Sequence, residues 1–305
     1  MNNIVWVIDH KEIDPSALTM LRDNGYVTII NTLSEDIKNK VVGIFVRTYT
    51  KIDAVIIDDL PNLKFILKAG VGLDNIDLTL AKNRGIQIYN SPGSNAKSVA
   101  EYVVGCTIFN LHKINQQSQN LQNGEWRSFN LIGEELSGKT FGMVGLGAVG
   151  REVAKRLIPF EVELLAYDPY VSPDLATTLG VNLVGLDDLL QRSDIISIQS
   201  PLTKETRGMF NKTRLSLIKN GATLINVSRG ELIDEGELIQ CVKDGKIDSV
   251  ALDVFCNEPN IDKNLQSLPN TLLSPHIAGF TKQAHQRMAV DAVNNLFNSN
   301  PSKFI

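Results

Sequence analysis

The chain has 305 residues, a formal net charge of −4 and 43 % hydrophobic residues. This length is sufficient for two domains with buried cores, and the acidic balance provides no basic surface for nucleic acid. The three cysteines are far apart without a CxxC pair, no apolar run reaches membrane length, and the amino end lacks the pattern of a signal peptide. We therefore expect a cytoplasmic protein with no metal, no nucleic-acid partner and no membrane partner.

Short apolar runs alternate with helical patterns along the whole chain. In the first part, the expected strands are residues 3–8, 27–30, 43–46, 65–69 and 86–89. In the second part, they are residues 140–145, 163–168, 194–200, 223–228, 250–255 and 271–275. These runs lack polar alternation, which is typical of parallel strands covered by helices on both faces. The predicted fold class is α/β, with a Rossmann domain inserted in a flavodoxin-like domain, each built on a doubly wound parallel sheet.

Two long helical patterns determine the expected domain boundaries. Residues 96–114 form a helix long enough to cross from one half to the other, and residues 282–298 form a second helix after the last strand. Nothing after that helix could form another βα unit, so we expect it to return to the first half. This predicts a discontinuous domain of residues 1–97 with 283–305, and a second domain of residues 98–282.

The segment GLGAVG provides the most specific local motif. It places Gly145, Gly147 and Gly150 in a GxGxxG pattern after an apolar strand and at the start of a helix, and Asp168 ends the next strand. In this context the glycines permit a tight turn, close approach of a pyrophosphate to backbone N–H groups, and packing of helix on strand. The carboxylate of Asp168 suits ribose hydroxyls and repels a 2′-phosphate. Residues 98–282 are therefore predicted to bind NAD rather than NADP.

Three polar side chains follow strands of the second sheet. They are Arg229, Glu258 and His276, and the carboxyl ends of parallel strands converge on the cofactor crevice. Each one alone has a structural explanation: a solvated turn for Glu258, a surface loop for His276, and a pair with Asp234 for Arg229. Together they fit hydride transfer to a carbonyl, which requires a proton donor and a cation that orients the substrate.

Several longer segments carry a resemblance to a known family. They are KAGVGLDNID at 68–77, NSPGSNAKSVAE at 90–101, NVSRGELIDEGEL at 226–238, ALDVFCNEP at 251–259 and SPHIAGFT at 274–281. In this order they resemble the D-isomer-specific 2-hydroxyacid dehydrogenase family, from about Arg47 through the last long helix. Within the family, LSGKTFGMVGLG and FTKQA are most similar to segments of short-form D-3-phosphoglycerate dehydrogenases.

The resemblance implies a role for each catalytic candidate. His276 is the expected general acid/base, Glu258 the carboxylate that favours its protonated form, and Arg229 the group that holds the carboxylate and carbonyl oxygen of the substrate. The backbone at Ala69, Gly70, Val71 and Gly72 is expected to bind the same carboxylate, and closure of the two domains to complete the site. Arg47 directly follows the apolar strand GIFV, and Lys68 lies at the carboxyl end of another strand, directly before AGVG. We expect both side chains to contact a substrate phosphate.

Further cofactor contacts follow from the same resemblance. The expected NAD-binding residues are Gly145, Gly147, Ala148, Val149, Gly150, Asp168, Ser200, Pro201, Val227, Ser228, Arg229, Asp253, His276, Ala278 and Gly279. One position departs from the family pattern, because Gln199 stands where a histidine is common. His10, His112 and His285 fall outside the motifs and are expected to be structural, and Cys256 is expected to be a filler residue without an activating base.

The expected function is NAD-dependent oxidation of D-3-phosphoglycerate to 3-phosphohydroxypyruvate in serine biosynthesis. The resemblance also implies a homodimer that associates through residues 96–140. One alternative is a sibling enzyme that acts on glyoxylate, hydroxypyruvate or another 2-hydroxy or 2-oxo acid, with the same catalytic residues. A second is a binding module similar to the NAD-binding corepressors of this fold, for which the chain offers no added interaction segment.

Overall fold

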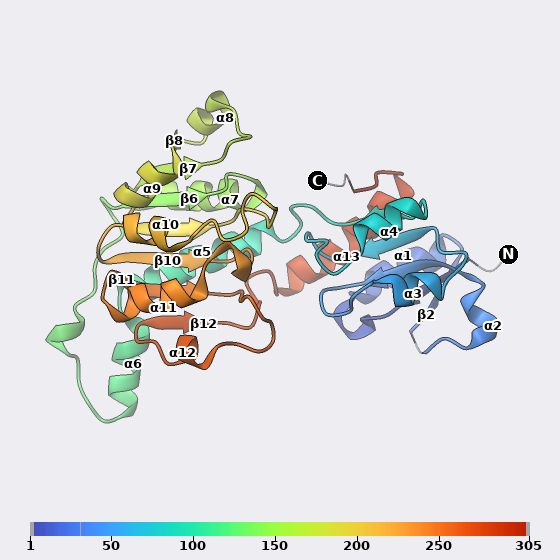
Figure 1. Ribbon diagram of the computed structural model, residues 1–305, viewed down its shortest axis with the longest axis horizontal. Helices are drawn as coiled ribbons and strands as arrows, with labels where there is room; N and C mark the ends of the chain where they lie inside the picture. Colours follow the sequence, from blue (N-terminus) through green and yellow to red (C-terminus); the bar gives the residue numbers. More distant parts are fainter. Residues whose placement is uncertain (1–2, 31, 303–305) are drawn as a thin grey trace. The chain divides into compact units, whose positions relative to one another are not determined.

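The computed structural model describes residues 3–30 and 32–302, which divide into two compact units (Figure 1). Unit 1 comprises residues 1–95 and 279–305, and unit 2 comprises residues 96–278. Unit 2 is therefore inserted into the sequence of unit 1. The predicted domain limits at 97/98 and 282/283 stay a prediction, and residues 303–305 of the predicted last segment lie outside the described residues.

Unit 1 is built on a parallel sheet of five strands in the order β2-β1-β3-β4-β5. The strands are β1 (Asn3–Val7), β2 (Tyr26–Ile29), β3 (Val41–Val46), β4 (Phe65–Lys68) and β5 (Gln87–Tyr89). This order is that of flavodoxin-like sheets. The predicted fold class of this half is confirmed.

Helices cover both faces of the first sheet. They are α1 (Pro15–Asp23), α2 (Glu35–Lys38), α3 (Ala54–Asp58), α4 (Leu78–Asn83) and α13 (Lys282–Phe297). One core contains apolar residues of α1 and α13, and the other contains residues of α3 and α4. Alternate residues of the central strands face the two cores, which explains why these strands lack a regular alternation of apolar and polar residues. The terminal helix α13 belongs to unit 1.

Unit 2 is built on a parallel sheet of seven strands in the order β12-β11-β10-β9-β6-β7-β8. The strands are β6 (Thr140–Val144), β7 (Glu163–Tyr167), β8 (Asn182–Leu183), β9 (Ile195–Ile198), β10 (Ala222–Asn226), β11 (Ile247–Leu252) and β12 (Thr271–Leu273). The direction of winding reverses between β6 and β9, and ligands of such sheets bind at the carboxyl ends of the strands beside this point. Only β8 was not predicted, because two residues carry no periodic signal.

Two layers of helices flank the second sheet (Figure 1). Its helices are α5 (Ala96–Leu111), α6 (Ile114–Gln122), α7 (Ala148–Leu157), α8 (Pro173–Thr178), α9 (Leu186–Arg192), α10 (Lys212–Leu217), α11 (Glu235–Lys243) and α12 (Lys263–Gln266). Apolar residues of α5, α7 and α8 form the core on one face. Residues of α9, α10, α11 and α12 form the core on the other, so this half also has the predicted doubly wound fold.

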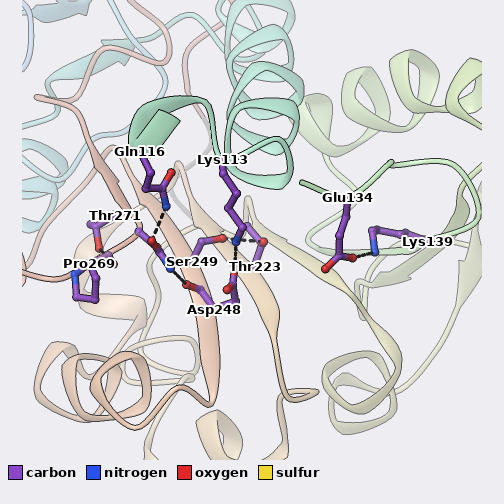
Figure 2. A network of polar contacts seen from close by, with 10 residues as sticks. Lys113, Gln116, Glu134, Lys139, Thr223, Asp248, Ser249, Pro269 and Thr271 are labelled. Carbon is purple, nitrogen blue, oxygen red and sulfur yellow. Dashed lines mark hydrogen bonds and ion pairs between the residues drawn. The ribbon is translucent and has the colours of Figure 1, made fainter. Parts of the chain in front are cut away.

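The helix predicted over residues 96–114 is interrupted. Helix α5 ends at Leu111, and α6 begins after Lys113, which adopts a left-handed conformation with φ of 53°. Figure 2 shows that the Lys113 ammonium bonds to Asp248, the second residue of β11. Gln116 of α6 bonds to Asn270. These contacts join residues more than 130 positions apart, so no local pattern could have predicted the break.

Candidate active site

Arg229 lies directly after β10, in a turn shaped by two neighbouring residues. The buried side chain of Asn226 donates to the Arg229 carbonyl at 2.9 Å and accepts from the Ser228 N–H at 3.1 Å. Gly230 packs so closely on the next loop that a Cβ atom there would lie 2.0 Å from the carbonyl carbon of Phe255. Only glycine allows this approach, which brings the Arg229 turn against the segment that leads to Glu258.

Glu258 and His276 form a hydrogen bond in unit 2. The distance between His276 Nδ1 and Glu258 Oε2 is 2.9 Å, and the other carboxylate oxygen, Oε1, accepts the Phe255 N–H at 3.0 Å. The Glu258 carboxylate is therefore fixed on both sides. Because a carboxylate only accepts, Nδ1 of His276 is the protonated nitrogen, which leaves Nε2 for a substrate oxygen.

The electrostatic environment keeps Glu258 ionised. Burial by itself would raise the pKa of Glu258, but the hydrogen bond and charge of His276, the Phe255 N–H and the charge of Arg229 together lower it below its ordinary value. The side chains of His276 and Glu258 are 33 % and 31 % exposed, so a proton on the imidazole can exchange with solvent or substrate.

Asp253 organises the turn that carries His276. It follows β11 and is 1 % exposed, and its carbonyl accepts the His276 N–H at 2.9 Å. Its carboxylate accepts the N–H groups of Ile277 and Ala278, both at 2.8 Å. This set of bonds holds His276 in a left-handed conformation with φ of 54°, which side chains rarely adopt without support. Asp253, predicted as a cofactor contact, thus has a structural role as well.

The glycine-rich loop connects β6 to α7 as the GxGxxG pattern predicts. Gly145 has a φ of 106° and packs against the backbone of Gln199 and Ser200, and a Cβ on Gly150 would lie 2.3 Å from the Gly145 carbonyl oxygen. A Cβ on Gly147 would meet nothing within 4 Å, so this position is open. Helix α7 begins at Ala148, and the N–H groups of its first turn, including that of Val149, have no acceptor within the helix. The arrangement fits the pyrophosphate of a dinucleotide.

Asp168 lies at the end of β7, beside this loop. Its Oδ2 accepts the Leu146 N–H at 2.8 Å, and its Oδ1 accepts the Tyr170 N–H at 2.9 Å. Each carboxylate oxygen retains lone pairs for a ribose hydroxyl. Residues 169–191 contain no lysine or arginine that could bind a 2′-phosphate.

The remaining residues predicted to contact the cofactor in unit 2 lie at the ends of β9 and β10. Ser200 donates to the Val144 carbonyl at 3.0 Å, and Ser228 donates to the Ser200 carbonyl. Pro201 follows Ser200, and the Val227 N–H bonds to Ile198 of β9. Gln199, the departure from the family pattern, donates to Ser197 Oγ at 3.0 Å. These bonds tie the ends of β6, β9 and β10 together at the point where the winding reverses.

In unit 1, the segment from Ala69 to Gly72 has defined peptide planes. The Gly70 carbonyl accepts from both the N–H and the hydroxyl of Ser91, and the Val71 carbonyl accepts from Asn90 Nδ2 at 2.7 Å. In a trans peptide the next N–H points opposite to the carbonyl. The N–H groups of Val71 and Gly72 therefore point away from Ser91 and Asn90. Gly279, also predicted as a cofactor contact, belongs to this unit and packs against Asn95.

Arg47 and Lys68 are both buried, at 8 % and 3 % exposure. The Lys68 ammonium donates to the Arg47 carbonyl and to Asn75 Oδ1, the latter at 2.8 Å. The Arg47 guanidinium donates to the Glu12 carbonyl and lies over the Phe280 ring, 5.4 Å from its centre. Neither side chain is a solvated surface charge. Their predicted contact with a phosphate stays a prediction.

Some features of the site were missed by the sequence. Asp253 and Asn75 act as hydrogen-bond centres for partners more than 20 positions away in the chain, which no local pattern could have predicted. Asn226 bonds to Ser228 and Arg229 close by, and its position at the end of a strand was the only local signal. Cys256, expected to be a filler, is exposed.

Within residues 3–30 and 32–302, no three His, Cys, Asp or Glu side chains form a group that could hold a metal ion. Nor does any helix in that described part have the length and apolarity to cross a membrane.

Comparison with known proteins identifies the family. The model described as "D-isomer specific 2-hydroxyacid dehydrogenase, NAD binding domain" matches residues 104–278, more than half of the chain. The chain belongs to this family. The match covers the glycine-rich loop, Asp168, Arg229, Glu258 and His276. The predicted family and a nicotinamide cofactor are thereby confirmed, while the choice between NAD and NADP is a separate question.

Relatives within the 2-hydroxyacid dehydrogenase family carry different names. D-3-phosphoglycerate dehydrogenase of Archaeoglobus fulgidus is 39 % identical over 298 residues, which cover 96 % of this chain and 56 % of that protein. The chain therefore spans little more than half of that relative. Hydroxypyruvate reductase of Thermotoga maritima is 41 % identical over 300 residues, covering 96 % of this chain and 97 % of that protein.

Solved structures share the whole fold. The crystal structure of an NADPH-dependent glyoxylate/hydroxypyruvate reductase from Sinorhizobium meliloti, in complex with NADP and malonate, has 30 % sequence identity and a TM-score of 0.86. The similarity covers 97 % of this chain and 93 % of that one.

Proposed function

We propose that this chain is an NAD-dependent D-2-hydroxyacid dehydrogenase with His276 as general acid/base. The observation that carries the proposal is the 2.9 Å contact between His276 Nδ1 and the ionised Glu258, beside the Arg229 turn. A paired imidazole and a cationic side chain at the carboxyl edge of a dinucleotide-binding sheet fit the requirements of hydride transfer between a carbonyl and an alcohol.

In this mechanism the chain's own residues bind the substrate and move one proton. Arg229 binds the carboxylate and orients the neighbouring oxygen through its planar set of donors. In oxidation, Nε2 of His276 takes the proton of the substrate hydroxyl, and the Glu258 carboxylate stabilises the resulting imidazolium. In reduction, the same nitrogen returns the proton to the carbonyl oxygen. A bound nicotinamide cofactor supplies the hydride acceptor or donor.

We propose NAD as the cofactor because of Asp168. Its carboxylate is held at the glycine-rich loop by the N–H groups of Leu146 and Tyr170, where a 2′-phosphate would meet a negative charge. The contacts of Ser200, Pro201, Val227, Ser228 and the segment 276–279 with this cofactor belong to the same proposal.

For the substrate we propose D-3-phosphoglycerate. Support comes from the name of the Archaeoglobus fulgidus phosphoglycerate dehydrogenase, which aligns with 96 % of the chain, and from Arg47, a cation at the carboxyl end of β3 that suits a phosphate. The backbone of Ala69–Gly72, with two N–H groups directed away from Ser91 and Asn90, suits the carboxylate.

Reduction of hydroxypyruvate is the second candidate, and the state of Lys68 favours it. Its ammonium is buried and already bonded to Arg47 and Asn75, which removes one of the two cations expected to select a phosphate. The similarity to hydroxypyruvate reductase also extends over nearly the full length of both proteins.

A substrate panel tests these proposals. The purified protein is assayed with NAD and NADP on D-3-phosphoglycerate, D-glycerate and glycolate, and in reverse with hydroxypyruvate and glyoxylate. Higher kcat/KM for D-3-phosphoglycerate than for D-glycerate supports the first substrate, and the opposite order supports the reductase. Tight NADH binding without turnover of any substrate would contradict enzymatic function and support a binding module.

A substitution in unit 1 tests whether the enzyme prefers D-3-phosphoglycerate to D-glycerate because of a contact with the phosphate. Arg47→Ala is expected to erode a preference for D-3-phosphoglycerate over D-glycerate by about 1.5–3 kcal/mol, the range for a hydrogen bond to a charged group. Arg84→Ala is the matched control, because Arg84 of the same unit pairs with Asp58 at the surface. Circular dichroism of both variants checks that the fold is retained. An unchanged preference in Arg47→Ala would contradict the proposed phosphate contact.

A further inference from the structure

A series of three hydrogen-bonded residues, Tyr102, Ser274 and Asp253, connects helix α5 to the turn that carries His276; we call it the hydrogen-bond series. The Tyr102 hydroxyl lies 2.5 Å from Ser274 Oγ, and Ser274 Oγ donates to Asp253 Oδ1. Ser274 and Asp253 are 8 % and 1 % exposed. All three residues belong to unit 2, although 172 positions separate Tyr102 from Ser274.

The donor and the acceptor of each hydrogen bond in the series can be assigned by starting from Asp253. The Asp253 carboxylate accepts from the Ser274 hydroxyl and from the N–H groups of Ile277 and Ala278. Burial raises the pKa of Asp253, whereas these three donors favour its ionised form. Ser274 gives its single hydrogen to Asp253 and can only accept from Tyr102. Burial raises the pKa of Tyr102 well above its usual range, so its hydroxyl retains the hydrogen that it donates.

At one end of the hydrogen-bond series, Asp253 fixes the backbone around His276. Asp253 is bonded to the N–H groups of residues 276, 277 and 278, the first through its carbonyl and the other two through its carboxylate. These bonds hold the left-handed conformation of His276, and thereby the position of its ring against Glu258. An imidazole displaced by a fraction of an ångström loses alignment for proton transfer.

We propose that Tyr102 is a positioning residue for the reaction, and that its hydroxyl holds the His276 turn through Ser274 and Asp253. The inference rests on the proposed function for its kinetic consequence, but its structural consequence does not. Tyr102 is not a catalytic residue, since it reaches His276 only through the other two. Tyr102 is the seventh residue of α5 and lies outside every motif used to predict the site.

The first test is Tyr102→Phe, which removes the hydroxyl and keeps the ring. We expect kcat to fall by about three- to tenfold, the effect of one neutral hydrogen bond, with KM for the substrate nearly unchanged. Ser274→Ala removes the middle hydroxyl of the hydrogen-bond series and is expected to lower kcat at least as much. Ser274→Thr keeps a hydroxyl and is expected to retain activity.

The control is a second buried hydroxyl pair in the same unit. Figure 2 shows Thr223 and Ser249, whose hydroxyl oxygens lie 2.9 Å apart on β10 and β11, at the amino ends of those strands. Both side chains are buried, at 3 % and 2 % exposure, as those of Ser274 and Asp253 are. Ser249→Ala removes a bond of the same kind from the same sheet, so it is expected to lower the thermal midpoint comparably without lowering kcat.

Amide hydrogen exchange gives a readout that is independent of activity. In the protein without ligands, Tyr102→Phe is expected to speed exchange of the Ile277 and Ala278 amides, and Ser249→Ala to leave them unchanged. The double variant Tyr102→Phe/Ser274→Ala is expected to lose no more kcat than Ser274→Ala alone, because both substitutions interrupt the same hydrogen-bond series.

Two results would overturn the inference. One is unchanged exchange at Ile277 and Ala278 in both Tyr102→Phe and Ser274→Ala. The other is an equal loss of kcat in Ser249→Ala and Tyr102→Phe, which would reduce the role of Tyr102 to general stability. Failure of the proposed function is distinguishable from both, because it would abolish turnover in the unsubstituted protein and leave the exchange experiment intact.

Discussion

Nδ1 of His276 and Oε2 of Glu258 lie 2.9 Å apart, although 18 residues separate them in the chain. The contact joins the loops that follow β11 and β12, two neighbouring parallel strands whose carboxyl ends meet at one edge of the sheet. It assigns the proton on the neutral imidazole to Nδ1, and with it the reactive nitrogen to Nε2.

Replacing His276 by alanine tests the acid/base. We expect kcat to fall by about 10²- to 10⁴-fold, the usual contribution of general acid/base catalysis, while the NADH dissociation constant measured by fluorescence changes little. The control is His112→Asn, because His112 lies in the same unit at the end of α5 and is exposed. Equal kcat in His276→Ala and His112→Asn would contradict the assignment.

Replacing Glu258 by glutamine tests the partner of the acid/base. The neutral amide stabilises an imidazolium less than the carboxylate does, so the pH profile of carbonyl reduction is expected to move to lower pH. The measurement is kcat/KM for reduction across the pH range in both proteins. Superimposable profiles would show that Glu258 has no influence on the proton of His276.

The same substitution has a consequence for stability. The pKa of Glu258 is lowered in the fold, because the favourable contacts, the largest from His276, outweigh the burial that would raise it. A carboxyl group with a lowered pKa contributes stability that is present above its ordinary pKa of 4.5 and is lost as the pH falls through the lowered value. The difference in free energy of unfolding between wild type and Glu258→Gln is therefore expected to shrink below pH 4.5. Urea titrations at neutral and acidic pH measure it, and a difference that grows in acid would contradict the direction of the shift.

Asp168 is predicted to determine the choice of cofactor. Asp168→Ala is expected to weaken NAD binding by about 1–3 kcal/mol and to relax discrimination against NADP. Because Asp168 also accepts the Leu146 and Tyr170 N–H groups, part of this loss comes from the loop itself. Asp168→Asn keeps an acceptor and removes the charge, so it is expected to relax the discrimination with a smaller loss of NAD affinity. Isothermal titration with both cofactors measures this, and unchanged selectivity in both variants would contradict the role.

Gly230 is predicted to be intolerant of any side chain. In Gly230→Ala the new Cβ would lie 2.0 Å from a backbone carbon of Phe255, so the Arg229 turn must move away from the loop that leads to Glu258. We expect a loss of about 1–3 kcal/mol or more in the free energy of unfolding, together with a fall in kcat. Gly236→Ala is the control, because its Cβ would make ordinary contact at 3.4 Å with Asp234 in the first turn of α11. Similar melting temperatures in the two variants would contradict the close approach.

The sequence by itself determined most of the strands and the order of the candidate site residues along the chain. Continuous apolar runs predicted both parallel sheets because burial on two faces leaves a local signature in each strand. The glycine spacing of GLGAVG and the polar residues Arg229, Glu258 and His276 could be singled out because they lie in the loops that follow predicted strands. Only the tertiary structure decided the break at Lys113, the burial of Arg47 and Lys68, and the bonds that converge on Asp253. Most of these features depend on hydrogen-bond partners that lie more than 20 positions away in the chain, and folding brings such partners together through packing that no short segment encodes.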